Sequence, residues 1–161
     1  ICDPITGQVV QYFQRVVLEY HPEQPLADRI QRRLLVEDLY PEPADPPADP
    51  SGPPGPDGFY FPRGPRGLGH FVSSYGPDGT IIRFKEYWDG HGREEAFGYP
   101  KEEPKLRGGR WTQRFQAAVF EYHPENDRPG PGPAGIPIRN YAVQLELLGD
   151  AYIAKYNLGL R

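Results

Sequence analysis

Residues 11–24 read QYFQRVVLEYHPEQ, and residues 113–126, at an offset of 102 positions, read QRFQAAVFEYHPEN. The two segments agree at nine of fourteen positions, and the block EYHPE is identical in both. Agreement of this extent indicates an internal repeat, and a repeat constrains every later inference about the fold. Further along the chain, the leucine pairs Leu34–Leu35 and Leu147–Leu148 also correspond, with one residue of slippage after them.

The two copies are unequal in length. A long segment, residues 68–110, precedes the second copy and contains FKEYW (Phe84–Trp88) and AFGYP (Ala96–Pro100), whereas the first copy has only a few residues before it. The sequence therefore predicts an N-terminal half repeat at residues 1–40 and a full repeat unit at residues 68–161.

A proline-rich connection separates the two units. Residues 41–67 hold ten Pro and five Gly, a composition typical of an extended polyproline-type linker. A second stiff loop, Pro124–Pro137, follows the second EYHPE block.

Periodicity predicts the secondary structure of the two units. Alternating β-branched and aromatic residues predict strands over Val9–Tyr20, Trp111–Tyr122 and Tyr141–Leu148. Residues 30–40 are ambiguous between strand and helix. Helical spacing of apolar residues predicts a short helix over residues 81–88 that ends at Gly90, and a last turn or two over residues 150–156. The expected fold class is α+β, a small antiparallel β-sheet module with one or two short helices and long Pro-rich loops.

Composition excludes several functions. Pro and Gly are 40 of 161 residues, but aromatic residues at 13% supply more ring surface than a disordered chain would carry. The net charge is −4 and both signs are mixed, so a basic stripe for nucleic acid is absent. No apolar run reaches the length of a membrane span.

The cysteine and methionine content of the chain indicates the environment in which the protein works. Cys2 is the only cysteine, which excludes an intrachain disulfide and leaves a free thiol or an intermolecular disulfide. The chain contains no Met, so a removed N-terminal stretch, such as a secretion signal, is expected. The scarcity of Met, Cys and Asn, together with Pro-rich loops, is typical of a heat-adapted protein from a thermophile.

The sequence offers little for catalysis or for cofactors. His21 and His123, with the glutamates around them, could be metal ligands, but neighbours in a strand point to opposite sides, so we expect a strand end and no metal or other cofactor. Calcium on the acidic residues 45–57 stays open. The chain has three Ser, none in a GxSxG motif, and no phosphate-binding loop, so we expect no enzyme.

The order FxxYW, FGYP, QxFxxxxxEYHPE and LLG resembles secreted repeat proteins of filamentous and thermophilic bacteria. The resemblance is carried by Phe84, Tyr87, Trp88, Phe97–Pro100, Gln113, Phe115, Glu121–Glu125 and Leu147–Gly149. The FGYP element is also distantly similar to LGFP repeats, which are associated with bacterial cell walls. The chain departs from the pattern at Gly90-His91-Gly92, and its first copy lacks FGYP. The resemblance implies an extracellular or cell-surface location and supplies no catalytic residues.

Two functions follow as hypotheses. The first is a secreted structural protein that self-associates with copies of itself into a homopolymer, a filament or matrix, because the half repeat is too small to bury a core and must pack on something larger. Its strand would add to the sheet of the next subunit by β-augmentation, with side chains from Val9, Phe13, Val17, Leu18 and Tyr20.

The alternative is a cell-wall or polysaccharide-binding module that stacks cell-surface sugars on exposed aromatic rings. The candidate platform consists of Tyr60, Tyr75, Tyr87, Trp88, Tyr99 and Trp111.

Overall fold

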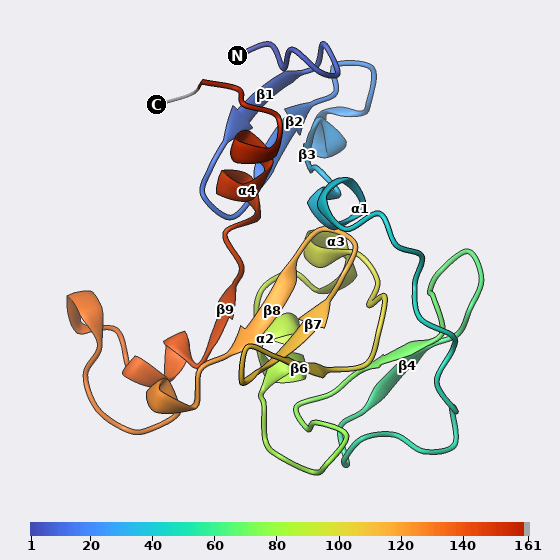
Figure 1. Cartoon of the computed structure of the whole chain (residues 1–161), viewed down its shortest axis with the longest axis vertical. Coiled ribbons are helices and arrows are strands. Elements are labelled where there is room, and N and C mark those ends of the chain that lie inside the picture. The colour runs from blue at the N-terminus through green and yellow to red at the C-terminus, as the bar shows by residue number, and fades with distance from the viewer. Residues whose placement is uncertain (160–161) are drawn as a thin grey trace.

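The half repeat opens the computed structural model, which describes residues 1–159 (Figure 1). Strands β1 (Val9–Tyr12), β2 (Val17–Tyr20) and β3 (Ile30–Arg32) form an antiparallel sheet in the order β1-β2-β3. A 3₁₀ turn, Leu26–Asp28, precedes β3, and the short helix α1 (Leu35–Leu39) follows it.

The full repeat unit contains the same plan. Strands β6 (Lys105–Arg107), β7 (Arg110–Arg114), β8 (Val119–Tyr122) and β9 (Val143–Leu145) form a four-stranded antiparallel sheet in that order, and helix α4 (Leu148–Lys155) follows. The hairpin β7–β8 repeats β1–β2 at the offset of 102, so that Val17 corresponds to Val119 and Tyr20 to Tyr122. The proline-rich loop before β9 carries three 3₁₀ turns, Pro124–Asn126, Pro133–Gly135 and Ile138–Tyr141.

A second layer, found only in the full unit, covers one side of this sheet. Strands β4 (Phe59–Phe61) and β5 (His70–Val72) form a two-stranded sheet, and helices α2 (Phe84–Gly90) and α3 (Arg93–Phe97) come next. The FxxYW and FGYP motifs lie on and after these helices. These elements, with the two hairpin sheets, confirm the α+β class for residues 1–159.

Three strand predictions are wrong in their extent. Residues 9–20 and 111–122 are not single strands but hairpins, closed by hydrogen bonds from the Phe13 amide to the Val16 carbonyl (2.9 Å) and from the Phe115 amide to the Ala118 carbonyl (2.8 Å). The turns contain neither Gly nor Pro, so they lack the residues that mark a chain reversal. The expected strand 141–148 is limited to β9 and then enters α4.

The remaining predicted elements differ from expectation by a few residues, whereas β4, β5, β6 and α3 were not predicted from the sequence. Residues 30–40 are both a strand and a helix, β3 and α1. Helix α2 begins at Phe84, because Ile81 pairs with Tyr75 in an isolated bridge and Arg83 at the N-cap has a φ of 59°. Helix α4 begins at Leu148, before the expected residue 150.

The expected linker lies on the full unit. The Asp45 amide donates to the Lys101 carbonyl (2.9 Å), and the Ala48 amide donates to the Gly69 carbonyl (2.8 Å). Phe59–Phe61, inside the expected linker 41–67, is strand β4, so the extended connection between the two units ends before Phe59.

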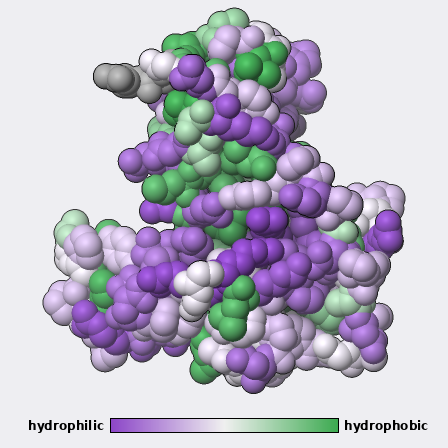
Figure 2. All heavy atoms as spheres, in the orientation of Figure 1, coloured by the Kyte–Doolittle hydropathy of each residue, from purple (hydrophilic) through white to green (hydrophobic). Residues whose placement is uncertain are grey.

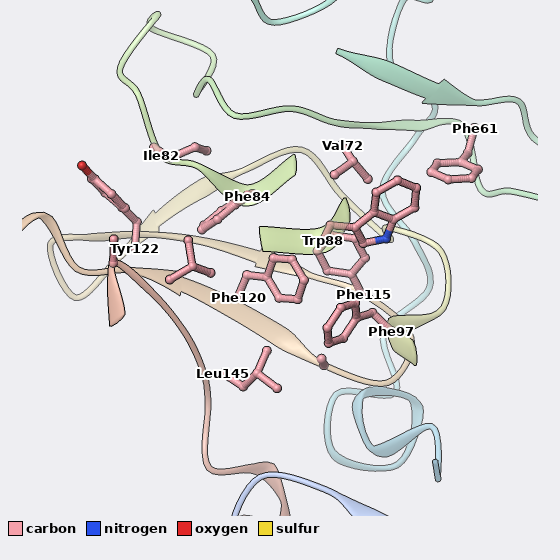
Figure 3. Packing of buried hydrophobic residues seen from close by; sticks show 13 residues of the cluster. Phe61, Val72, Ile82, Phe84, Trp88, Phe97, Phe115, Phe120, Tyr122 and Leu145 are labelled. Carbon is pink, nitrogen blue, oxygen red and sulfur yellow. The ribbon is translucent and has the colours of Figure 1, made fainter. Parts of the chain in front are cut away.

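The main core lies between the full unit's sheet and its covering layer (Figure 3). Phe120 of β8 stands at its centre, with ring centroids 5.7 Å from Phe84, 5.2 Å from Tyr87 and 4.9 Å from Phe97. The buried aromatic and aliphatic members shown in Figure 3 are Phe61, Val72, Ile82, Phe84, Trp88, Phe97, Phe115, Phe120, Tyr122 and Leu145.

A second core joins the two copies. It consists of Val10, Val17, Leu35, Val36, Val119, Leu148 and Tyr152. Equivalent residues of both copies, such as Val17 with Val119 and Leu35 with Leu148, contribute to it, as expected of an interface with approximate two-fold symmetry.

Each helix of this second core contacts the hairpin of the other copy. The Val36 amide of α1 donates to the Gln116 carbonyl in the β7–β8 turn (3.2 Å), and the Asp150 amide of α4 donates to the Gln14 carbonyl in the β1–β2 turn (3.1 Å). We call this reciprocal arrangement the helix exchange. In Figure 1, the red helix α4 of the full unit accordingly lies beside the blue strands β1 and β2 of the half repeat.

Among residues 1–159, no helix combines the length and the apolar composition that crossing a membrane requires.

Candidate functional site

The helix exchange gives each hairpin sheet an inner face, toward α1 and α4, and an outer face on the opposite side. On the full unit, the outer face carries Trp111, Gln113, Phe120, Tyr122, Val143 and Leu145. At the equivalent positions, the outer face of the half repeat carries Val9, Gln11, Leu18, Tyr20, Ile30 and Arg32. The two outer faces can therefore be compared position by position.

The comparison shows opposite burial at equivalent positions. On the full unit, helices α2 and α3 cover the outer face, and Phe120 is completely buried. On the half repeat, Val9 is 53% exposed and Ile30 is 60% exposed. Phe13, in the first hairpin turn, is 43% exposed, although its counterpart Phe115 is completely buried.

An open groove of about 500 Å³ lies over the half repeat's outer face. Its lining includes Ile1, Val9, Leu18, Tyr20 and Ile30. Figure 2 shows apolar side chains gathered at the waist, between an upper lobe of mixed hydropathy and a lower lobe that is mostly hydrophilic in this view. An exposed apolar patch bordered by polar residues is typical of an interaction surface.

The equivalent glutamines of the two outer faces, Gln113 and Gln11, differ in hydrogen bonding in the same way. The side-chain amide of Gln113 is fully buried and donates to the carbonyls of Phe71 (2.8 Å) and Glu102 (2.9 Å), which belong to the covering layer and its end. Its counterpart Gln11 is exposed, and its side chain has no hydrogen-bond partner within residues 1–159.

One edge of the half repeat's sheet, that of β1, is already paired. The Ile1 ammonium donates to the Val10 carbonyl (2.8 Å), the Val10 amide donates to the Ile1 carbonyl (2.7 Å), and Cys2 forms a bridge with Val9. The first residues therefore cover the free edge of β1, where an added strand would otherwise pair.

The five residues expected to form an assembly strand are divided between two faces and a turn. Val9, Leu18 and Tyr20 lie on the outer face, Phe13 lies in the hairpin turn, and Val17 is buried in the second core. Since they form a hairpin rather than one strand, they cannot all enter a neighbouring sheet together.

A salt-bridge cluster that sequence reasoning missed holds the half repeat to α4. Arg33 is buried and donates to Asp3, to Glu19 (2.6 Å) and to the Tyr152 hydroxyl (2.6 Å). Burial alone would raise the pKa of Asp3, but hydrogen bonds from Arg33 and from the Ile5 amide outweigh it, and the pKa lies below its ordinary value.

The equivalent contact occurs on the other side of the helix exchange. The Tyr40 hydroxyl donates to Glu146 (2.5 Å), and the Arg114 guanidinium stacks 3.9 Å from the centre of the Tyr40 ring. Burial and the contact with Glu146 raise the pKa of Tyr40 to about 12. The only sequence signal for these contacts was the loose repetition of Tyr40 and Tyr152 after the leucine pairs.

The EYHPE motif brings its histidine close to its glutamates. His21 lies between Glu23, at 2.9 Å from Nδ1, and Glu19, at 3.3 Å from Nε2. The hydrogen bond with Glu23 raises the pKa of His21 above its ordinary value, although burial opposes this shift. The expectation that these side chains do not converge is therefore wrong, because the chain bends after His21 and returns Glu23 to the same side.

His123 repeats the arrangement, with Glu125 at 3.1 Å and Glu121 at 3.7 Å. In the part of the chain that the structure describes, no group of three or more His, Cys, Asp or Glu side chains is placed to hold a metal ion.

The six aromatic residues of the expected sugar platform do not share an exposed surface. Trp88 is completely buried, with its ring against Phe61 (5.6 Å). Tyr87, Tyr99 and Trp111 are half-buried against the main core. Tyr60 packs on Phe71, and Tyr75 packs over Gly55. Four of these rings, Tyr87, Trp88, Tyr99 and Trp111, therefore lie in or against the main core, where aromatic side chains contribute large buried area.

Comparison of the chain with protein-family models, with curated proteins and with solved structures found no match.

Proposed function

We propose that this chain is a secreted structural protein that associates with copies of itself by exchanging its half repeat between chains. The observation that carries the proposal is the helix exchange, in which each copy of the repeat is completed by the helix of the other. The resemblance of its motifs to secreted repeat proteins supports the extracellular setting.

An interface between two copies of one repeat can form within a chain or between chains. The contacts are the same in both cases: the amide of Asp150 with Gln14, Tyr152 with Arg33, and Tyr40 with Glu146. Exchange of an identical element between subunits therefore costs few contacts and depends mainly on protein concentration and on the connecting segment.

The connecting segment is long enough for exchange. Residues 41–58 can reach roughly 56 Å when extended, at about 3.1 Å per residue. Their hydrogen bonds to Lys101 and Gly69 must open first. Because residues 9–20 form a hairpin, the exchanged element is the whole half repeat rather than one added strand. A half repeat that docks on the next chain leaves that chain's half repeat free, so the contact propagates into a filament wherever the rotation between chains does not close a ring.

Two single-cysteine chains test the exchange directly. One carries Gln14→Cys and the other carries Asp150→Cys, both with Cys2→Ser. The backbone hydrogen bond between these residues brings them close enough for a disulfide after small adjustments. The chains are unfolded together, refolded at high concentration and oxidised. We expect a disulfide-linked heterodimer on a non-reducing gel.

The control pairs Gln24→Cys with Asp150→Cys, because Gln24 lies beyond the opposite end of the hairpin. The proposal would be overturned if the test pair formed no more disulfide-linked heterodimer than this control pair. Sedimentation velocity on the unmodified chain provides the second readout, with oligomers expected to grow with concentration.

A further inference from the structure

We propose that the outer face of the half repeat is a docking surface for an aromatic helix pair that carries FxxYW followed by FGYP and belongs to a partner polypeptide. This inference goes beyond the proposed exchange of half repeats between chains, because that exchange uses the inner face of the half repeat. The evidence is the second copy of the repeat, in which a segment of this type is seated on the equivalent face.

The seated segment defines the chemistry of the partner. On the full unit, Phe84 of α2 and Phe97 of α3 contact Phe120 (Figure 3), and Tyr87 of α2 contacts it as well. The half repeat places Leu18 at the position of Phe120 and Val9 at that of Trp111. The smaller side chains leave more room over the same backbone, so aromatic side chains of the same size or larger fit the groove.

A polar anchor accompanies the apolar surface. Gln113 holds the covering layer through two backbone carbonyls, and Gln11 lies at the same position with its amide free among the described residues. The Gln11 amide would donate hydrogen bonds to backbone carbonyls of a docked segment, and the segment would shield the groove from water. Backbone carbonyls also make this contact independent of the partner's side chains at that point.

One corner of the face is already occupied. Arg32 replaces Leu145, and its guanidinium lies 5.3 Å from the centre of the Phe97 ring of this chain's own α3. The docking surface therefore consists of the other outer-face positions, from Val9 to Ile30, and the partner approaches from the side away from α3.

A fusion protein provides the test. Residues 59–104 are added a second time before Ile1 through a flexible Gly/Ser linker, which raises the effective concentration of a segment that must fold as it docks. Ile30→Cys, in a Cys2→Ser background, reports on the groove through its rate of reaction with a thiol reagent. We expect the added segment to slow this reaction at least tenfold, because the counterpart Val143 is buried in the main core.

Two controls and one further variant, Gln11→Glu, make the result specific. A matched fusion carries Ala in place of the two phenylalanines of the added segment that correspond to Phe84 and Phe97, and it should leave Ile30→Cys reactive. Leu26→Cys, 82% exposed and outside the groove, should react equally fast with and without the added segment. Gln11→Glu should restore most of the reactivity of Ile30→Cys in the fusion.

Equal reaction rates at Ile30→Cys in the fusion, in the matched fusion and in the unfused chain would overturn the docking surface. The measurement is made at a dilution where the chain is monomeric by sedimentation. A negative result would therefore leave the exchange of the half repeat between chains untouched, and failure of that exchange would leave the docking surface untouched.

Discussion

Phe13 and Phe115 show that residue identity alone does not determine burial in this protein. Both begin the turn of a hairpin, and both donate the same backbone hydrogen bond across it. Phe115 nevertheless lies 4.4 Å from the Phe120 ring inside the main core, whereas Phe13 is 43% exposed. The difference comes from the covering layer, which only the full unit has.

Replacing these two residues should therefore have unequal effects on stability. Phe115→Ala removes a fully buried ring and should lower the free energy of unfolding by about 3–5 kcal/mol. Phe13→Ala should lower it by less than about 1.5 kcal/mol, because part of the ring is already in water. Denaturant melts of both variants provide the measurement. A change below about 1 kcal/mol for Phe115→Ala would contradict its place in the core.

Glu102 should make stability depend on pH. Burial would raise the pKa of this carboxyl, but two hydrogen bonds from Arg107 (2.6 and 2.7 Å) outweigh it and lower the pKa below its ordinary value. A carboxyl with a lowered pKa in the folded state stabilises the protein above its unfolded pKa, about 4.3, and this contribution is lost as the pH falls through the folded pKa.

Glu102→Gln should therefore be less stable than the unmodified chain at pH 7, and the difference should shrink between about pH 4.5 and pH 2. Thermal melts of both proteins across this range test the expectation. A difference in melting temperature that stays constant down to pH 2 would show that the charge of Glu102 does not stabilise the fold.

At the scale of elements, the two exchanged helices differ in how closely they approach the opposite hairpin. Helix α4 has Gly149 in its first turn, where an added Cβ would lie 1.7 Å from the Phe13 carbonyl oxygen. Helix α1 has Val36 at the corresponding position, and it is fully buried in the second core. The approximate symmetry of the helix exchange therefore breaks at this residue.

Gly149→Ala should push α4 away from the β1–β2 turn and weaken the hydrogen bond between Asp150 and Gln14. We expect a loss of about 1–3 kcal/mol, the usual cost of overpacking. Gly90→Ala at the end of α2 is the matched control, because nothing lies within 4 Å of the added Cβ. If Gly149→Ala leaves the denaturation midpoint unchanged, as Gly90→Ala should, α4 does not approach the turn as closely as the structure shows.

At the scale of the whole molecule, the main core is built from the full unit alone. Every residue of the main core lies between Phe61 and Leu145, so the half repeat contributes none. The second core, by contrast, needs both copies, and Tyr152 of α4 depends on Tyr12 and Arg33 of the half repeat.

Deleting residues 1–40 should therefore preserve the main core and release α4. We expect the near-ultraviolet circular dichroism of the packed aromatic rings to persist, the helical signal to fall, and the truncated chain to sediment as a monomer. Complete loss of the near-ultraviolet signal in the truncated chain, at a temperature where the intact chain is folded, would show that the full unit cannot fold without the half repeat.

The amino-acid sequence by itself determined the repeat, the unequal copies, the α+β class and the position of the helix that carries FxxYW, whereas LLG was assigned to a strand. These features follow from local patterns, since Phe84, Tyr87 and Trp88 have helical spacing and EYHPE recurs unchanged. The ends of α2 were found within a few residues, because they depend on nearby residues along the chain, but α3 was not predicted and α1 lay in a segment left ambiguous between strand and helix.

Only the tertiary structure decided the turns at Gln14 and Gln116, the exchange of α1 and α4, and which outer face is covered. The turns lack Gly and Pro, and alternation continues in each arm, so the pattern resembles one long strand. The burial of Trp88 and the exposure of Ile30 depend on which segments lie against them, and those segments are distant in the chain. Contacts between such distant segments leave no periodic pattern in the sequence, because hydrophobic burial has no direction and accepts any apolar partner of suitable shape.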